Sequence, residues 1–151
     1  RLAAEIPEKL AAIAPVAGAL FDSSPKPKGR VAVLMIHGLA DTAVPYKGGD
    51  SQRERVQKRQ SEPYKSLDYA ARYWSGNNAC RPVPIKSAAG NITREKYAGC
   101  SSGADVEVLT ISDGLHSWPG GEKGREAADA PSNSISATDT IWEFFKAHKQ
   151  N

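Results

Sequence analysis

The chain contains 151 residues with a formal net charge of +3 and a sequence pI of about 8.9, a length that suits one domain with its own core. This mild positive charge, without an RNA- or DNA-binding motif, argues against a nucleic-acid-binding protein. No apolar run is long enough to cross a membrane, and the chain opens at Arg1 within a helical pattern, without a signal peptide. We therefore expect a processed product or a fragment.

The first part of the chain predicts one helix and two strands. Apolar residues at helical spacing over 1–9 indicate the end of a helix, and a short apolar run over 11–16 predicts a strand. A loop rich in proline, lysine and serine over 21–30 leads to six consecutive apolar residues, 31–36. Because 31–36 shows no polar alternation, we expect a strand covered on both faces inside a parallel sheet.

The middle of the chain combines a charged segment with a predicted helix. Residues 47–60 read as a solvated surface insertion, or alternatively as a patch that attracts anionic plant polymers, because they include Arg53, Arg55, Lys58 and Arg59 among Asp50 and Glu54. From Ser61 the pattern is helical: Ser61 can cap the helix and Pro63 fits its first turn. Its predicted core face contains Tyr64, Leu67, Ala71 and Trp74, and the helix is expected to end at 76–78.

Strands dominate the next part of the prediction. Residues 81–89 contain two prolines and are predicted as a loop or an edge strand. Residues 92–98 are predicted as a strand that turns through 99–103 into a further strand over 106–112. A Gly-, Ala- and Ser-rich loop over 120–134 is expected to form a mobile rim.

The last predicted element is a helix that starts at a capping-box-like pair, Ser136 and Asp139. Ile141, Trp142, Phe145 and His148 fall on one face of this helix. We expect the aromatic residues Trp142, Phe144 and Phe145 to lie in the core. His148 is expected at the surface, near the C-terminal dipole of the helix.

Two polar residues follow the predicted buried strands at equivalent places. Asp41 lies just beyond 31–36, and His116 lies in a glycine-bounded loop after 106–112. In open α/β sheets, catalytic groups collect beyond the carboxyl ends of the strands. An aspartate and a histidine placed in this way can act as the orienting acid and the base of a nucleophilic triad. The alternatives are a turn-forming aspartate and a loop histidine that touches Trp118.

Four stretches together resemble a known family. They read H-G-L-A-D-T-A-V-P-Y, Y-A-G-C-S-S-G-A-D-V-E-V-L-T-I, G-L-H-S-W-P-G-G and I-W-E-F-F-K-A-H, in that order. This combination resembles the C-terminal half of the secreted polyhydroxybutyrate depolymerase and feruloyl esterase family, a branch of the α/β-hydrolases, over residues 1–148. The resemblance implies one α/β-hydrolase domain over 1–151, the C-terminal part of a mostly parallel sheet flanked by helices. Central parallel strands are expected near 11–16, 31–36 and 106–111.

The resemblance implies a serine-type carboxylic ester hydrolase without a metal or an organic cofactor. Asp41 would orient His116, and His116 would be the base for a serine expected upstream of Arg1, as the hydrolase order Ser, Asp, His requires. Ser101 fits G-x-S-x-G as a string but lies between the acid and the base and precedes a strand, so we do not expect it to be the nucleophile. Residues 22–24 lie on no strand-to-helix turn and are excluded likewise. His37 is expected to support the Asp41 loop.

The same family implies further features. Cys80 and Cys100, the only cysteines, match a pair that the family oxidises, which agrees with a secreted or periplasmic protein. Trp118 and Pro119 are expected to form one wall of the substrate pocket, which suits an ester of a polyester or of the plant cell wall.

Other interpretations remain open at this point. The chain could belong to an acetyl-xylan or other polysaccharide esterase, or it could be a non-catalytic fragment or binding module that retains the fold. The expected partners are the ester substrate and either the missing N-terminal half or a second copy joined at a sheet edge. We expect neither nucleic acid nor a membrane as a partner.

Overall fold

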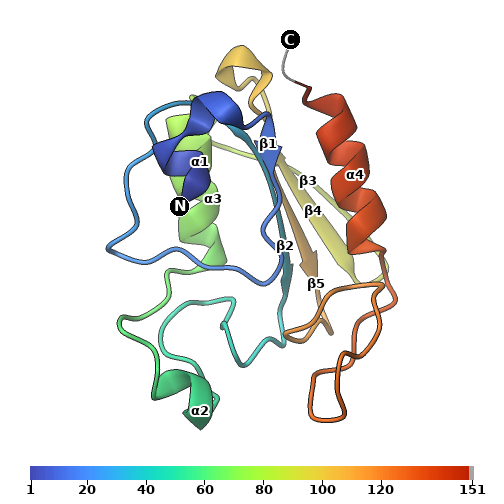
Figure 1. Ribbon diagram of the computed structural model, residues 1–151. Coiled ribbons are helices and arrows are strands. Elements are labelled where there is room, and N and C mark those ends of the chain that lie inside the picture. The colour runs from blue at the N-terminus through green and yellow to red at the C-terminus, as the bar shows by residue number, and fades with distance from the viewer. Residues whose placement is uncertain (150–151) are drawn as a thin grey trace.

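The computed structural model describes residues 1–149 and contains one mixed five-stranded sheet (Figure 1). The strands are β1 (Ala12–Ile13), β2 (Ala32–Gly38), β3 (Ile85–Ala89), β4 (Ile92–Tyr97) and β5 (Val106–Ile111). Their order across the sheet is β1-β2-β5-β4-β3, in which β1, β2 and β5 are parallel and β4 and β3 are antiparallel to their neighbours. The three predicted parallel strands are confirmed, and the antiparallel hairpin makes the sheet mixed rather than mostly parallel.

Strands β2 and β5 form the centre of the sheet, and all their residues are buried. Helix α3 (Leu67–Asn77) and the short α1 (Leu2–Glu5) cover one face, whereas α4 (Ala137–Ala147) covers the other (Figure 1). The side chains on both faces of β2 are therefore shielded from water, which explains its uninterrupted apolar sequence. The remaining helices are the 3-10 turns η1 (Pro7–Lys9) and η2 (Ser101–Gly103) and the four-residue α2 (Glu54–Gln57).

The predicted start of α3 at Ser61 is wrong. Helix α3 begins at Leu67, and the side chain of Ser66 accepts a hydrogen bond from the backbone N–H of Tyr69. The preceding segment is extended because Tyr64 pairs with Gly49 through two backbone hydrogen bonds of 2.8 and 2.9 Å. This long-range bridge competes with a local helical turn, and the sequence around Ser61 gives no sign of it.

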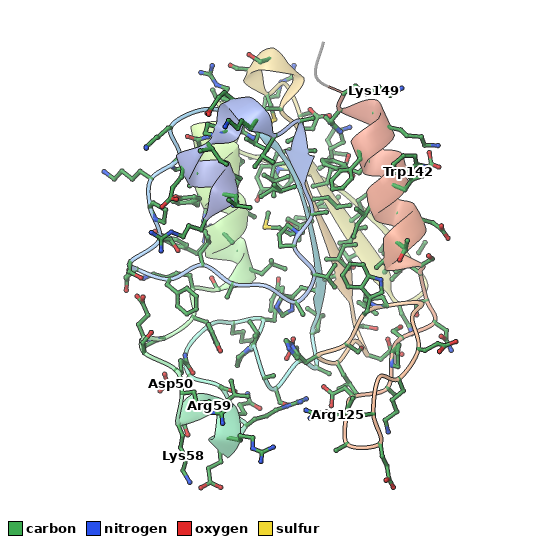
Figure 2. The ribbon with its side chains drawn as sticks, viewed as in Figure 1. Asp50, Lys58, Arg59, Arg125, Trp142 and Lys149 are labelled. Atoms are coloured by element: carbon green, nitrogen blue, oxygen red, sulfur yellow. A yellow bond between two sulfur atoms is a disulfide. The ribbon has the colours of Figure 1, made fainter. Side chains whose placement is uncertain are left out.

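The prediction for α4 is correct at its start and wrong along its face. Ser136 caps the helix by accepting from the Asp139 N–H. Trp142 was expected in the core but is 61% exposed, whereas Phe144 is buried; Figure 2 shows Trp142 on α4. His148 is not a surface residue, since its side chain is only 11% exposed and its ring packs 4.2 Å from that of Phe144.

A disulfide between Cys80 and Cys100 closes the base of the β3–β4 hairpin. Next to it, the backbone N–H of Arg81 donates to the carbonyl of Ala98 at 2.9 Å. The expected pairing is therefore present, and it joins the end of α3 to the turn before β5. Within residues 1–149, no helix has the length and apolar character needed to span a bilayer.

Candidate functional site

Asp41 and His116 meet at the carboxyl ends of two adjacent parallel strands. Asp41 follows β2 and His116 follows β5, and the loops after these strands lie at the same end of the sheet (Figure 1). His116 Nδ1 lies 2.9 Å from Asp41 Oδ2, although the two residues are 75 positions apart in the chain. This contact depends on the pairing of β2 with β5, which aligns His37 with Thr110 and Gly38 with Ile111.

Two glycines allow the loops after β2 and β5 to approach this closely. A Cβ atom added to Gly38 would lie 2.1 Å from the carbonyl oxygen of Gly114, and one added to Gly114 would lie 2.8 Å from Gly38 Cα. The Ala40 N–H donates to the Gly114 carbonyl at 3.0 Å, and the Leu39 N–H donates to the Ile111 carbonyl at 2.9 Å. Side chains at 38 or 114 would therefore separate the backbones that carry Asp41 and His116.

The Asp41 carboxylate is held as an anion. Its side chain is fully buried, and its Oδ1 accepts hydrogen bonds of 2.8 Å from the backbone N–H groups of Ala43 and Val44. Burial alone would raise the pKa of Asp41, but the hydrogen bonds from His116, Val44 and Ala43 outweigh it and leave the pKa lowered. Asp41 can therefore hold one tautomer of His116 without leaving its ionised state.

The imidazole ring of His116 is held in place by Asp41 and is still partly exposed to solvent. Its side chain is 41% exposed. The hydrogen bond with Asp41 raises the pKa of His116, against the opposing effect of its partial burial. Because Nδ1 faces Asp41, Nε2 points away from the carboxylate. An imidazole held in this way can accept a proton at Nε2 and return it later, as the base of a nucleophilic hydrolase does.

A second ion pair, which sequence reasoning missed, supports the His116 loop. Asp129 Oδ2 accepts the backbone N–H of His116 at 3.0 Å and is paired with the Arg53 guanidinium. Arg53 Nε also donates to Thr42 Oγ1 at 3.0 Å, next to Asp41. Arg53 was assigned to a solvated insertion and Asp129 to a mobile rim, and no sequence pattern links two residues 76 positions apart.

Three residues near Asp41 and His116 differ in their exposure to solvent: Trp118, Pro119 and His37. Trp118 is 47% exposed and its Nε1 donates to Thr138 Oγ1 of α4 at 3.1 Å. Pro119, expected in the pocket wall, is buried, and its carbonyl accepts the N–H of Ala137 at the start of α4. His37 is buried, its Nδ1 lies 3.0 Å from the Gly38 carbonyl, and it packs edge-on against Tyr46. His37 is therefore a buried residue near the end of β2, four positions before Asp41.

Ser101 lies at the other end of the sheet from His116. It belongs to η2, which precedes β5, whereas His116 follows β5 (Figure 1). The six-residue strand between them spans roughly 16 Å. The other hydroxyls considered, Ser23 and Ser24, are engaged in other hydrogen bonds: Ser23 donates to Glu62, and Ser24 Oγ accepts the Phe21 N–H at 2.9 Å. Within residues 1–149, no group of three or more His, Cys, Asp or Glu residues could hold a metal ion.

No protein-family model matches the chain. The chain is 32% identical over 159 residues to a protein of Nocardia uniformis subsp. tsuyamanensis named "Putative esterase NocK". The match covers 95% of this chain and 46% of that protein, so the chain spans about half the length of the curated relative it matches. This similarity supports a relationship to an esterase-like family at a coarse level.

Proposed function

We propose that this chain supplies the base and the orienting acid of a serine-type carboxylic ester hydrolase. The observation that carries the proposal is the 2.9 Å hydrogen bond between His116 Nδ1 and the buried Asp41 carboxylate, beyond two adjacent parallel strands. The similarity to a protein named as an esterase supports the same reaction class. The order of the four motifs favours the branch that contains polyhydroxybutyrate depolymerases and feruloyl esterases.

The nucleophile in this proposal is a serine outside these 151 residues. In α/β-hydrolases the serine precedes the acid in the chain, and its hydroxyl must reach Nε2 of the histidine. Ser101 meets neither condition, because it follows Asp41 and lies beyond the opposite end of β5. In this proposal, strands from the part of the protein that carries the serine pair with β1. This two-residue strand lies at the edge of the sheet and pairs with β2 alone. The disulfide fits an exported protein.

The chemistry assigns one role to each residue. His116 removes the proton of the serine hydroxyl as it attacks the ester carbonyl, and later gives that proton to the departing alcohol. Asp41 keeps the proton of His116 on Nδ1 and stabilises the imidazolium that forms. Trp118, exposed two residues after His116, offers an apolar wall to the ester. Water then hydrolyses the acyl intermediate with His116 again as the base.

A fluorophosphonate probe, which labels only an activated serine, tests the proposal when combined with intact-mass and peptide analysis. The protein containing this chain should be labelled at a serine outside residues 1–151. Asp41→Asn should lower its hydrolysis of p-nitrophenyl acetate about 10⁴-fold, and His116→Gln about 10⁶-fold. Asp113→Asn removes one negative charge from the same loop, at an exposed residue that bonds Asn91, and should retain activity.

Two results would contradict the proposal. Labelling of a serine within residues 1–151, with Ser101 the first to be substituted, would overturn the external nucleophile. Full activity in the His116→Gln variant would mean that the Asp41 and His116 pair belongs to a non-catalytic domain that retains the fold.

A further inference from the structure

A separate hollow lies beside α2, and neither Asp41 nor His116 lines it. Its volume is ≈ 470 Å³, within the range of small-molecule sites. Three segments that are distant in the sequence form its walls: Phe21, residues 55–64, which include most of α2, and the loop that carries Arg125. Figure 2 shows Arg59 at α2 and Arg125 on the loop beyond it, at the same end of the molecule.

The hollow has an unbalanced positive charge. Arg55, Arg59 and Arg125 line it, no acidic side chain does, and none of these arginines forms an ion pair within the described part of the chain. Four carboxylates near the lining residues are engaged elsewhere: Glu54 pairs with Lys58, Asp129 pairs with Arg53, Asp22 pairs with Lys65, and Glu62 accepts hydrogen bonds from Ser23. Glu126 follows Arg125 in the chain but does not line the hollow. Three guanidinium groups around one hollow repel each other, and a bound anion would relieve this repulsion.

Aromatic surface lies among the arginines. The rings of Phe21 and Tyr64 contact each other with centroids 5.4 Å apart at an interplanar angle of 51°, and both residues line the hollow together with Val56. Phe21 and Tyr64 are each partly buried. The hollow therefore offers an apolar surface to a flat ligand body as well as donors to an anionic group.

The Arg53–Asp129 ion pair links the segment of Arg55 and Arg59 to the loop that carries Arg125. Arg53 lies two residues before Arg55, and Asp129 lies four residues after Arg125. The side chains of this pair are 33% and 18% exposed, so the contact is partly shielded from solvent. Because it joins the segments close to the lining arginines, their guanidinium groups are kept on the same side of the molecule before any ligand binds.

We propose that this hollow binds a carboxylate carried on a six-membered ring. The guanidinium groups of Arg55, Arg59 and Arg125 pair with the carboxylate, since the planar donor fork of arginine matches two carboxylate oxygens. The ring of the ligand packs against Phe21 and Tyr64. The ring is that of an aromatic acid or of an acidic sugar. Neither Asp41 nor His116 lines this hollow, and the proposal does not depend on the ester hydrolysis proposed above.

Isothermal titration calorimetry at low ionic strength tests the site with two carboxylates, benzoate and glucuronate, and their neutral counterparts, benzamide and glucose. At least one carboxylate should bind more tightly than its neutral counterpart, and the tighter of the two identifies the class of ring. Arg59→Gln and Arg125→Gln should each weaken that binding about tenfold. Lys123→Gln, which removes a positive charge two residues from Arg125 but outside the lining, should leave it unchanged.

Three outcomes would overturn the proposal: no binding of either carboxylate, equal binding of the neutral compounds, or equal loss in the Lys123→Gln control. Inorganic phosphate that binds as tightly as both carboxylates would also overturn it, because the aromatic surface would then contribute nothing. None of these binding results tests the role of His116, which is measured by the hydrolysis of p-nitrophenyl acetate.

Discussion

The guanidinium of Arg53 is paired with the carboxylate of Asp129, and that carboxylate also accepts the backbone N–H of His116. Arg53 reaches the other side of the site as well, by donating to Thr42 Oγ1 beside Asp41. One arginine thus connects the loop of the proposed acid to the loop of the proposed base. Arg53 contacts Asp129, which binds the backbone of His116, and Thr42, the neighbour of Asp41. It acts on the proposed acid and base through these residues, which makes it a positioning residue.

We predict that Arg53→Gln and Asp129→Asn lower kcat/KM for ester hydrolysis by about 10- to 100-fold, because a shift of about 1 Å in a reacting group has an effect of this size. The measurement is made on the protein that includes the nucleophile, together with the pH dependence of the rate. Lys58→Gln is the control, since Lys58 lies on the same segment and its pair with Glu54 is exposed. Unchanged kinetics in both variants would show that the ion pair does not position His116.

The approach of Gly38 to Gly114 predicts that Gly38→Ala both destabilises the protein and separates Asp41 from His116. The new methyl group would overlap the Gly114 carbonyl, and overpacking of this kind costs about 1–3 kcal/mol. Urea denaturation measures the loss. Gly76→Ala is the matched control: nothing lies near its Cβ position, and alanine in α3 should leave stability unchanged or raise it by up to about 1 kcal/mol. Equal stability of the two variants would contradict the close packing.

The pKa shifts of His116 and Asp41 predict that the two residues make the stability of the fold depend on pH in opposite directions. The folded pKa of His116 is raised above 6.5, so its contribution is complete below pH 6.5 and is lost as the pH rises through the folded pKa. The folded pKa of Asp41 is lowered below 3.8, so its contribution is present above pH 3.8 and is lost as the pH falls through the folded pKa. Asp41→Asn should remove both dependences.

Urea denaturation of the wild type and of Asp41→Asn at a series of pH values checks this expectation. The NMR titration of the His116 ring should also show a pKa above 6.5 in the wild type, and a lower one in the variant. A His116 pKa that is equal in both proteins would mean that the Asp41 carboxylate does not act on the ring in solution.

The Cys80–Cys100 disulfide joins two residues with a sequence separation of 20 and closes the loop between them. Its loss should lower the free energy of unfolding by about 3 kcal/mol in the chain-entropy model. The double variant Cys80→Ser, Cys100→Ser would show this loss in urea denaturation, and a reducing agent would lower the stability of the wild type alone. A wild type that is insensitive to reductant would mean that the bridge contributes little to stability.

The elements predicted best are those with a strong local cause. Strand β2 follows from an uninterrupted apolar run, β5 follows from a mainly apolar stretch that contains Glu107 and Thr110, and the start of α4 follows from the Ser136 cap. Burial in the sheet and capping are both visible in a short window of residues. The start of α3 was missed because the Gly49–Tyr64 bridge holds the preceding residues extended. The exposure of Trp142 was missed because helical spacing gives a face but not which face meets the sheet.

The sequence by itself determined that an aspartate and a histidine follow two buried strands, because the apolar runs and the polar residues after them are local features. Only the tertiary structure decided that β2 and β5 are neighbours and that Gly38 and Gly114 let their loops meet, so that His116 reaches Asp41. The same holds for Arg53, whose role depends on Asp129 from a distant loop. Contacts of this kind are set by packing across the whole sheet, which no short segment encodes.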